Sequence, residues 1–177
     1  MSSLFNHIFI PISILLIFSK RLKIDPKNVI LLSFFGILPD ADITLFHRAT
    51  LHNIFILIVP ILIFIFNKDI REVSGIICFY LGSHLLLDIF DGGIFLLYPF
   101  YNNVFYSVIE LIFNNGIIFN VGISKYIINM KTIGEPMISS ENVGVATLLI
   151  ITMLISIIIK NNTTKPNVVN KTNKNSP

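Results

Sequence analysis

The chain has few charged residues and a single cysteine, and both features limit the classes of protein to which it can belong. Only 13% of its 177 residues are charged, whereas a soluble domain carries about a quarter. One cysteine, Cys78, cannot form a disulfide framework within a chain. The sequence also lacks a Walker loop, a dinucleotide-binding fingerprint, a nucleophile elbow and any signal for an organic cofactor. Since 54% of the residues are hydrophobic, the composition indicates an integral membrane protein.

Long apolar runs fill most of the chain and predict an all-α membrane helix bundle. A full bilayer crossing needs about 20 helical residues, so we expect about four to five transmembrane or half-membrane helices. Pro99 and two Asn pairs interrupt one run, part of which we expect to lie at the membrane interface. The runs occupy residues 4–19, 28–38, 51–66, 73–91, 94–119 and 143–159.

Two groups of basic residues set the expected orientation. Cytoplasmic loops are rich in Lys and Arg, so we place both groups in the cytoplasm and predict a multi-pass protein of the cell membrane. Neither group has interleaved aromatic residues, and we expect no nucleic-acid partner. The groups are Lys20, Arg21, Lys23 and Lys27, and Lys160, Lys165, Lys171 and Lys174.

The domain limits follow from the same patterns. Residues 1–159 are predicted to form one integral membrane domain, and residues 160–177 a disordered, polar, basic tail. The first apolar run has neither the charged start nor the cleavage site of a secretory signal, so we expect it to remain as a helix.

Most histidines and aspartates of the chain lie in three short places. Ionisable groups within membrane segments are costly, and each is a functional candidate. Counting 1.5 Å per helical residue from the cytoplasmic end of each run puts five of them at heights of about 16–22 Å. We therefore predict a recessed polar pocket near the extracytoplasmic face. The five residues are His7, Asp40, His52, His84 and Asp88.

The pair His84 and Asp88 gives the clearest chemical signal. Residues four apart project from one face of a helix, so the imidazole and the carboxylate can share a metal ion. Zinc accepts nitrogen and oxygen ligands, and a catalytic zinc site keeps a position for water. Gly92-Gly93 is expected to end the helix beside the pocket. The alternative is a buried His–Asp hydrogen bond that joins two helices.

Three further residues are candidates for catalytic roles, each with a plainer alternative. Arg48 can bind a phosphate oxygen, or it can anchor the chain at headgroup level. Asp42 or His47 can act as a general base, or can support the site from the surrounding loop. For the other candidates the alternatives are an interfacial histidine at His7 and a turn residue at Asp40.

The ordered set of motifs resembles the membrane-bound metal-dependent hydrolases, also described as LexA-binding, inner-membrane-associated hydrolases. The resemblance covers about residues 1–100. The set is specific as an ordered whole, although each motif is weak by itself. It comprises His7, Leu38-Pro39-Asp40-Ala41-Asp42, His47-Arg48, His52, His84-x-x-x-Asp88, Gly92 and Pro99.

That family is similar in ligand pattern to zinc-dependent phospholipases C and the P1-type nucleases. The resemblance implies a helical metal site that acts on phosphoesters, with Asp88 as a bridging ligand. The implied ligands are His7, Asp40, His52, His84 and Asp88.

The chain departs from the family pattern at several positions. Asn6 stands where threonine is favoured, and Leu51 and Asn53 stand where threonine and serine are usual. A later histidine pair is missing, so a full trinuclear site cannot be assembled. We expect one zinc-type divalent ion, or two if Asp88 bridges.

Three hypotheses follow for the function. The leading one is a membrane-embedded, zinc-type hydrolase of a phosphoester, such as a phospholipid headgroup. The second is a metal-binding membrane protein without catalysis, either an ion carrier or a sensor. The third is a structural membrane protein whose polar residues only join helices.

Overall fold

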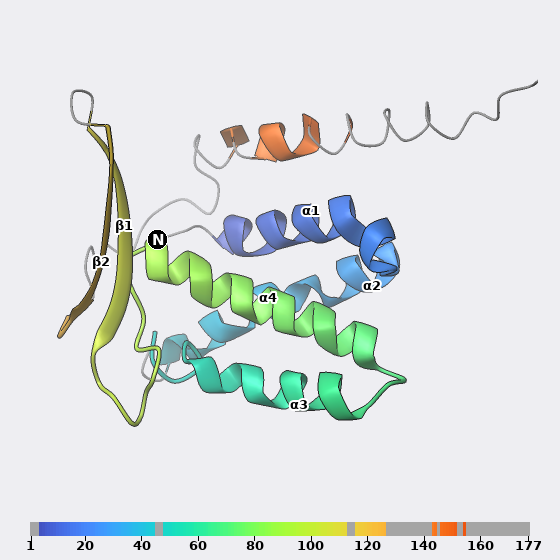
Figure 1. The fold of residues 1–177 in the computed structure, drawn as a ribbon, viewed down its shortest axis with the longest axis horizontal. Helices are drawn as coiled ribbons and strands as arrows, with labels where there is room; N and C mark the ends of the chain where they lie inside the picture. The colour runs from blue at the N-terminus through green and yellow to red at the C-terminus, as the bar shows by residue number, and fades with distance from the viewer. Residues whose placement is uncertain are drawn as a thin grey trace, which may run out of the picture.

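The computed structural model describes residues 4–44, 48–112, 116–126, 143–144, 146–151 and 154. Within these residues the chain forms several helices and then one β-hairpin, and the described residues between 143 and 154 are again helical (Figure 1). The elements are α1 (Leu4–Leu22), α2 (Pro26–Leu31), the 3-10 helices η1 (Leu32–Gly36), η2 (Leu38–Thr44) and η3 (Ile54–Leu57), α3 (Ile58–Phe66), α4 (Arg71–Phe90), β1 (Val104–Ile112) and β2 (Gly116–Ser124).

Two of the helices are long and apolar enough to cross a membrane. They cover Phe5–Leu22 in α1 and Arg71–Phe90 in α4. The predicted runs at 28–38 and 51–66 instead form shorter pieces, among them an apolar helical stretch over Ile54–Phe66. The run at 143–159 is only partly described, and the predicted tail at 160–177 lies outside the described residues.

Local sequence explains where these helices begin and end. Asp25 accepts a hydrogen bond from the Lys27 backbone N–H and caps α2, whose first residue is Pro26. At the other end of the bundle α4 stops before Gly92 and Gly93, which have φ angles of 109° and 94°. The glycine pair therefore ends α4 as predicted.

The apolar core joins α1, α2 and α4. Leu15, Val29, Ile76 and Tyr80 are buried together, and the Tyr80 hydroxyl donates to the Val29 carbonyl at 2.7 Å. A buried hydroxyl must find a partner, so this bond fixes α4 against α2. The core thus fixes α1 and α4 relative to each other, and both helices carry buried polar residues nearer the hairpin.

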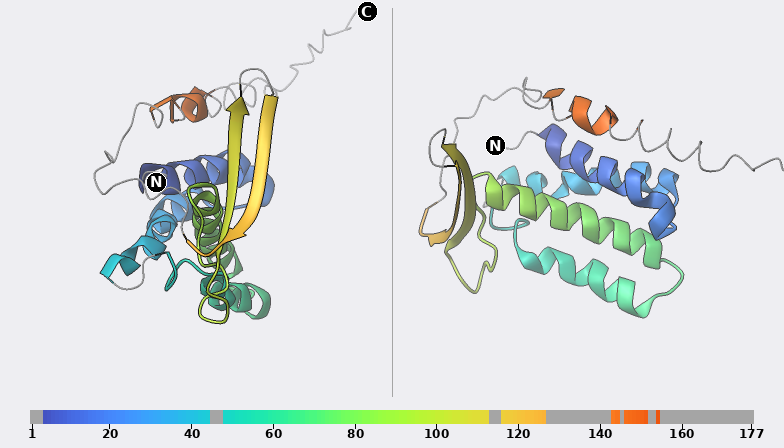
Figure 2. Two further views of the ribbon diagram at one scale, coloured as in Figure 1. Left: turned by 90° about the vertical axis from the view of Figure 1, so that its left-hand side faces the viewer. Right: turned by 45° about the horizontal axis from the view of Figure 1, so that its top comes forward.

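The all-α prediction is wrong for one segment, because β1 and β2 form an antiparallel hairpin. The register pairs Val104 with Ser124 and Ile112 with Gly116. β1 is rich in β-branched and aromatic residues, which favour strands. Ile94 and Phe105 exchange two backbone hydrogen bonds of 3.0 and 2.9 Å, which tie β1 to the segment after α4. The hairpin runs across the ends of the helices in Figures 1 and 2.

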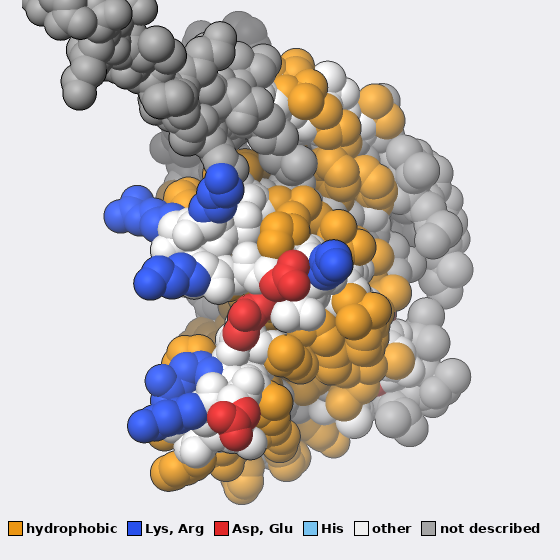
Figure 3. Space-filling model, turned by 90° about the vertical axis from the view of Figure 1, so that its right-hand side faces the viewer, with side chains coloured by type: hydrophobic (Ala, Val, Ile, Leu, Met, Phe, Trp, Pro, Cys, Tyr) orange, Lys and Arg blue, Asp and Glu red, His pale blue; other side chains and the backbone are white. Residues whose placement is uncertain are grey.

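Six of the described basic residues lie at the opposite end of the bundle: Lys20, Arg21, Lys23, Lys27, Lys68 and Arg71. Figure 3 shows Lys and Arg side chains gathered on this end, over the α1–α2 and α3–α4 connections. Glu72 at the start of α4 accepts hydrogen bonds from the Asp25 backbone and the Asn28 side chain. The described bundle therefore has one charged end and one end crossed by the hairpin.

Candidate metal centre

Four segments bring buried polar side chains together near the hairpin end of the bundle. α1 carries His7, η2 carries Asp40, the loop before η3 carries His52, and α4 carries His84 and Asp88. His52 and His84 are fully buried, whereas 25% of the Asp40 side chain is exposed. The structure thus gathers all five predicted metal ligands in one place and leaves the cluster open beside Asp40.

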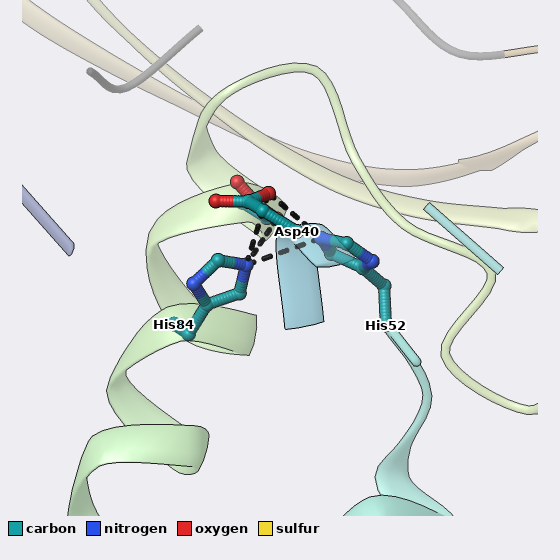
Figure 4. A group of neighbouring side chains, drawn as sticks. Asp40, His52 and His84 are labelled. Atoms are coloured by element: carbon teal, nitrogen blue, oxygen red, sulfur yellow. Dashed lines mark hydrogen bonds and ion pairs between the residues drawn. The ribbon is translucent and has the colours of Figure 1, made fainter. Parts of the chain in front are cut away.

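Asp40, His52 and His84 point toward one another in Figure 4, and Asp88 supplies the fourth ligand atom of the cluster. The two Nε2 atoms of His52 and His84 are 3.1 Å apart, and each lies 3.2 Å from Asp88 Oδ2. Asp40 Oδ1 lies 3.4 Å from His52 Nε2 and 3.6 Å from His84 Nε2. All four atoms lie within 4.8 Å of one another.

These separations match the edges of a coordination tetrahedron. Zinc–nitrogen and zinc–oxygen bonds of about 2.0–2.1 Å in a regular tetrahedron place neighbouring ligand atoms about 3.3–3.4 Å apart. The five atom pairs above are 3.1–3.6 Å apart. The two imidazoles and the two carboxylates could therefore hold a metal ion, with the sixth pair, Asp40 and Asp88, within 4.8 Å.

The second nitrogen of each imidazole has an acceptor that orients the ring. His84 Nδ1 lies 2.7 Å from the Gly36 carbonyl, and His52 Nδ1 lies 3.2 Å from Asp42 Oδ2. A carbonyl or carboxylate can only accept, so Nδ1 is the donor in both rings. Each Nε2 atom then faces the cluster and is the ring nitrogen that a metal ion would bind. This arrangement is typical of metal-ligating histidines, whose other nitrogen donates to a carboxylate or carbonyl.

Electrostatics in the loop region favour a cation. Burial disfavours the charged form of His52, but hydrogen bonds with Asp40 and Asp88 and the charges of Asp88 and Asp42 prevail and raise its pKa from 6.5 to about 9. Burial opposes ionisation of Asp40, yet the hydrogen bond with His52 and the neighbouring imidazoles lower its pKa. The carboxylates thus hold positive charge at this point, either as a proton on His52 or as a metal ion that displaces it.

His7 lies on the far side of the Asp88 carboxylate. Its Nε2 is 3.4 Å from Asp88 Oδ1, while Asp88 Oδ2 faces His52 and His84. The rings of His7 and His84 are 4.0 Å apart between centroids. His7 is therefore outside the group of four facing atoms and contacts the other oxygen of Asp88.

Asp42 lies behind His52, away from the four facing atoms. It is fully buried and accepts hydrogen bonds from the Leu51 backbone N–H at 3.0 Å and from His52 Nδ1. Of the two alternatives weighed for Asp42, this geometry favours support of a ligand over general-base catalysis. His47 lies outside the described residues.

Arg48 points at the end of α4. Its guanidinium donates to the Asp91 and Gly93 carbonyls at 3.0 and 3.2 Å, and it pairs with the Asp91 carboxylate at 3.3 Å. The backbone φ of Arg48 is 63°, a conformation that a non-glycine residue rarely adopts. These contacts favour a role in bracing the site over one in binding phosphate.

One supporting group was not anticipated from the sequence. Gly36 supplies the carbonyl that accepts from His84, and a Cβ at this glycine would lie 2.5 Å from the His7 carbonyl oxygen. Close approach of η1 to α1 thus requires glycine, and it brings His7 beside His84. A lone glycine in an apolar run carries no signal that could have revealed this.

Long apolar helices and a buried His–Asp cluster define a membrane protein with a candidate metal centre. A family profile supports the membrane class, since it matches residues 1–164. The chain belongs to the YdjM inner membrane protein family. No curated protein and no solved structure matches the chain.

Proposed function

We propose that the chain is a membrane-embedded, metal-dependent hydrolase of the zinc type. The observation that carries this proposal is the set of four facing ligand atoms, separated by 3.1–3.6 Å in the five measured pairs. Such a group is costly in a membrane protein unless a cation compensates the two carboxylates. The orientation of the Nε2 atoms of His52 and His84 adds to the case.

The residues divide into holding and orienting roles. His52, His84 and Asp88 are the buried ligands, and Asp40 is the ligand on the open side. Zinc bound there would lower the pKa of a coordinated water toward about 7 and polarise a phosphoryl or carbonyl oxygen. Because Asp40 is partly exposed, water or a substrate oxygen would reach a bound ion from that side. Asp42 and Gly36 orient the imidazoles.

His7 gives the site a capacity for a second ion. It faces the second oxygen of Asp88 at 3.4 Å, so that carboxylate can bridge two cations. One protein imidazole and one carboxylate oxygen are a sparse ligand set, and the second ion would be the weaker one. We therefore propose one tightly held ion and a weaker second ion.

We propose a phosphoester, such as a phospholipid headgroup, as the substrate. Phosphoester chemistry is what the resemblance of the sequence motifs to membrane-bound metal-dependent hydrolases implies. The inner membrane family supports a lipid-related substrate. The multi-pass topology that we propose puts the basic end in the cytoplasm and the metal centre toward the opposite face.

Metal content and turnover test the proposal together. The protein purified in detergent should contain about one equivalent of zinc or another divalent metal, and should release water-soluble headgroup from phospholipid. His84→Ala should lose both properties. Asp69→Asn removes an exposed carboxylate at the basic end and is the matched control, expected to retain both.

Two outcomes would assign a different function. Metal bound in the wild type without turnover of any phosphoester or ester would favour a carrier or sensor. Absence of metal from the wild type, with unchanged stability when His84 and Asp88 are both replaced by leucine, would favour a purely structural role.

A further inference from the structure

The strand β2 presents an exposed apolar row at the hairpin end of the bundle. Phe119, Val121 and Ile123 are 58%, 68% and 55% exposed. Side chains two apart in a strand point to the same face, so these three form one row. Within the described chain β2 pairs with β1 on one side only. Contiguous exposed apolar surface of this kind marks a binding face.

This row continues the apolar surface of a membrane helix. Phe90, the last residue of α4, contacts Phe119 with ring centroids 6.4 Å apart. Leu86, one turn earlier on α4, is 55% exposed. The surface that α4 offers to lipid therefore passes without a break onto the hairpin.

The junction between α4 and the hairpin is closely packed. A Cβ at Gly93 would lie 2.5 Å from Val104 Cγ1 and 2.7 Å from the Phe105 carbonyl oxygen. Backbone hydrogen bonds between Ile94 and Phe105 hold the same junction. The hairpin thus keeps a set position across the helix ends, as Figure 2 shows from two sides.

The length of α4 gives the depth of the hairpin. Twenty residues span about 30 Å, which is the thickness of the hydrocarbon core. With the basic residues at one membrane surface, the end of α4 reaches the other. An open strand edge does not occur within hydrocarbon, because its backbone groups would lack partners, whereas water at the interface can satisfy them. Tyr126, which is 78% exposed after β2, also suits this level.

We propose that the row Phe119–Val121–Ile123 is a lipid-binding surface, which lies in the interfacial zone of the leaflet on the side of the metal centre. The partner is the upper acyl-chain and glycerol region of phospholipids. This inference depends on the apolar row and the length of α4, and it stands whether or not the metal centre is catalytic.

The chain contains no tryptophan, so a single introduced indole reports one position. We would reconstitute Phe119→Trp and Val121→Trp in vesicles of phosphatidylcholine and phosphatidylglycerol, with bromine atoms placed either high or low on the acyl chains. Asn120→Trp is the control on the opposite face of β2. Ile58→Trp is the deep control, because exposed Ile58 lies about 12 Å along α3 from its end at Phe66.

The expected result is a blue-shifted emission for Phe119→Trp and Val121→Trp, with greater loss of fluorescence to high bromines than to low ones. Ile58→Trp should show the reverse order. Asn120→Trp should emit further to the red and be quenched by iodide in the water. Circular dichroism and metal content equal to the wild type would show that each variant is folded.

Three results would overturn the proposal. Quenching of Phe119→Trp by iodide but not by brominated lipid would place the row in water. A blue-shifted emission that neither quencher reduces would mean that protein, such as a second copy of the chain, covers it. Stronger quenching by low bromines would place the hairpin inside the hydrocarbon.

Discussion

At the scale of single residues, the orientation of two imidazoles is the central feature. His52 is held by the charged Asp42 carboxylate, whereas His84 is held by the neutral Gly36 carbonyl. A carboxylate partner raises the basicity of its imidazole more than a carbonyl does. The supporting group of His52 should therefore contribute more to metal affinity than the supporting group of His84. Replacing Asp42 would measure this contribution.

Asp42→Asn should lower metal affinity without unfolding the protein. The amide keeps the shape of the side chain but removes the charge behind His52, and loss of such a partner typically costs about 10–100-fold in affinity. Competition titration against a chromophoric chelator would measure the change. Asp69→Asn makes the same substitution at the basic end and should leave the affinity unchanged. Equal affinities for both variants would contradict the assigned role of Asp42.

Gly36→Ala should destabilise the protein by about 1–3 kcal/mol, because the added Cβ would meet the His7 carbonyl oxygen at 2.5 Å. Gly82→Ala in α4 is the control, since a Cβ there has nothing within 4 Å. That change should be neutral or stabilising by up to about 1 kcal/mol. Denaturant unfolding in detergent would compare the two variants, and similar losses in both would refute the close packing at Gly36.

Some of these residue contacts could be predicted from the sequence and others could not. The spacing of four between His84 and Asp88 placed both on one helix face, as the structure shows for their contact at 3.2 Å. The contact between Asp42 and His52 depends on the path of the intervening loop, which has no periodicity to indicate it. The hydrogen bond between His84 and Gly36 joins residues that are 48 apart in sequence, and no sequence pattern indicates it.

At the scale of elements, Arg48 joins the loop that carries His52 to the end of α4. Its side chain donates to Asp91 and Gly93, and its carbonyl accepts from the Phe95 N–H at 3.1 Å. These bonds fix the loop relative to the helix that carries His84 and Asp88. Arg48 is thus a positioning residue for the metal centre.

Two substitutions at Arg48 should distinguish the stability contributed by its side-chain hydrogen bonds from the cost of its backbone conformation. Arg48→Ala should cost about 1–3 kcal/mol, since the carbonyls at Asp91 and Gly93 lose a buried donor. Arg48→Gly should be less destabilised than Arg48→Ala by up to about 1 kcal/mol, because glycine adopts the φ of 63° without strain.

Hydrogen exchange would locate these effects in residues 48–53 and 91–95. Metal affinity should fall in parallel with protection of this region. A loss of protection confined to other elements would contradict the bracing role.

The sequence predicted the two long helices but not the β-hairpin. α4 was predicted because the run at 73–91 has full crossing length, and α1 because the shorter run at 4–19 reaches that length once its flanking residues are counted. The hairpin was missed because the hydrophobic run at 94–119 hides its alternation. One signal was present, since Asn115-Gly116 follows a stretch rich in Val, Ile, Phe and Tyr, and this dipeptide is typical of tight hairpin turns.

At the scale of the whole molecule, the two ends of the bundle have opposite character. Basic side chains gather at the α3–α4 connection, and the buried carboxylates of the candidate metal centre lie toward the hairpin. The proposed orientation places the first end in the cytoplasm. It also places the exposed residue Ala41, beside the cluster, outside.

Cysteine labelling would test this orientation. In a Cys78→Ser background, Ala41→Cys should react with a membrane-impermeant maleimide added to intact spheroplasts. Lys68→Cys should react only after the membrane is opened. The reverse pattern would mean that the metal centre opens to the cytoplasm.

The candidate ligands also lie in separate stretches of the chain, and this has a consequence for biosynthesis. A growing polypeptide has the complete set only after Asp88 has left the ribosome, because Asp40 and His52 precede α4 in the chain. A chain whose α4 is inserted in the wrong orientation contains every ligand residue but cannot bring these residues together into one metal centre. Retention of metal would therefore distinguish correctly assembled molecules from mis-inserted ones during quality control.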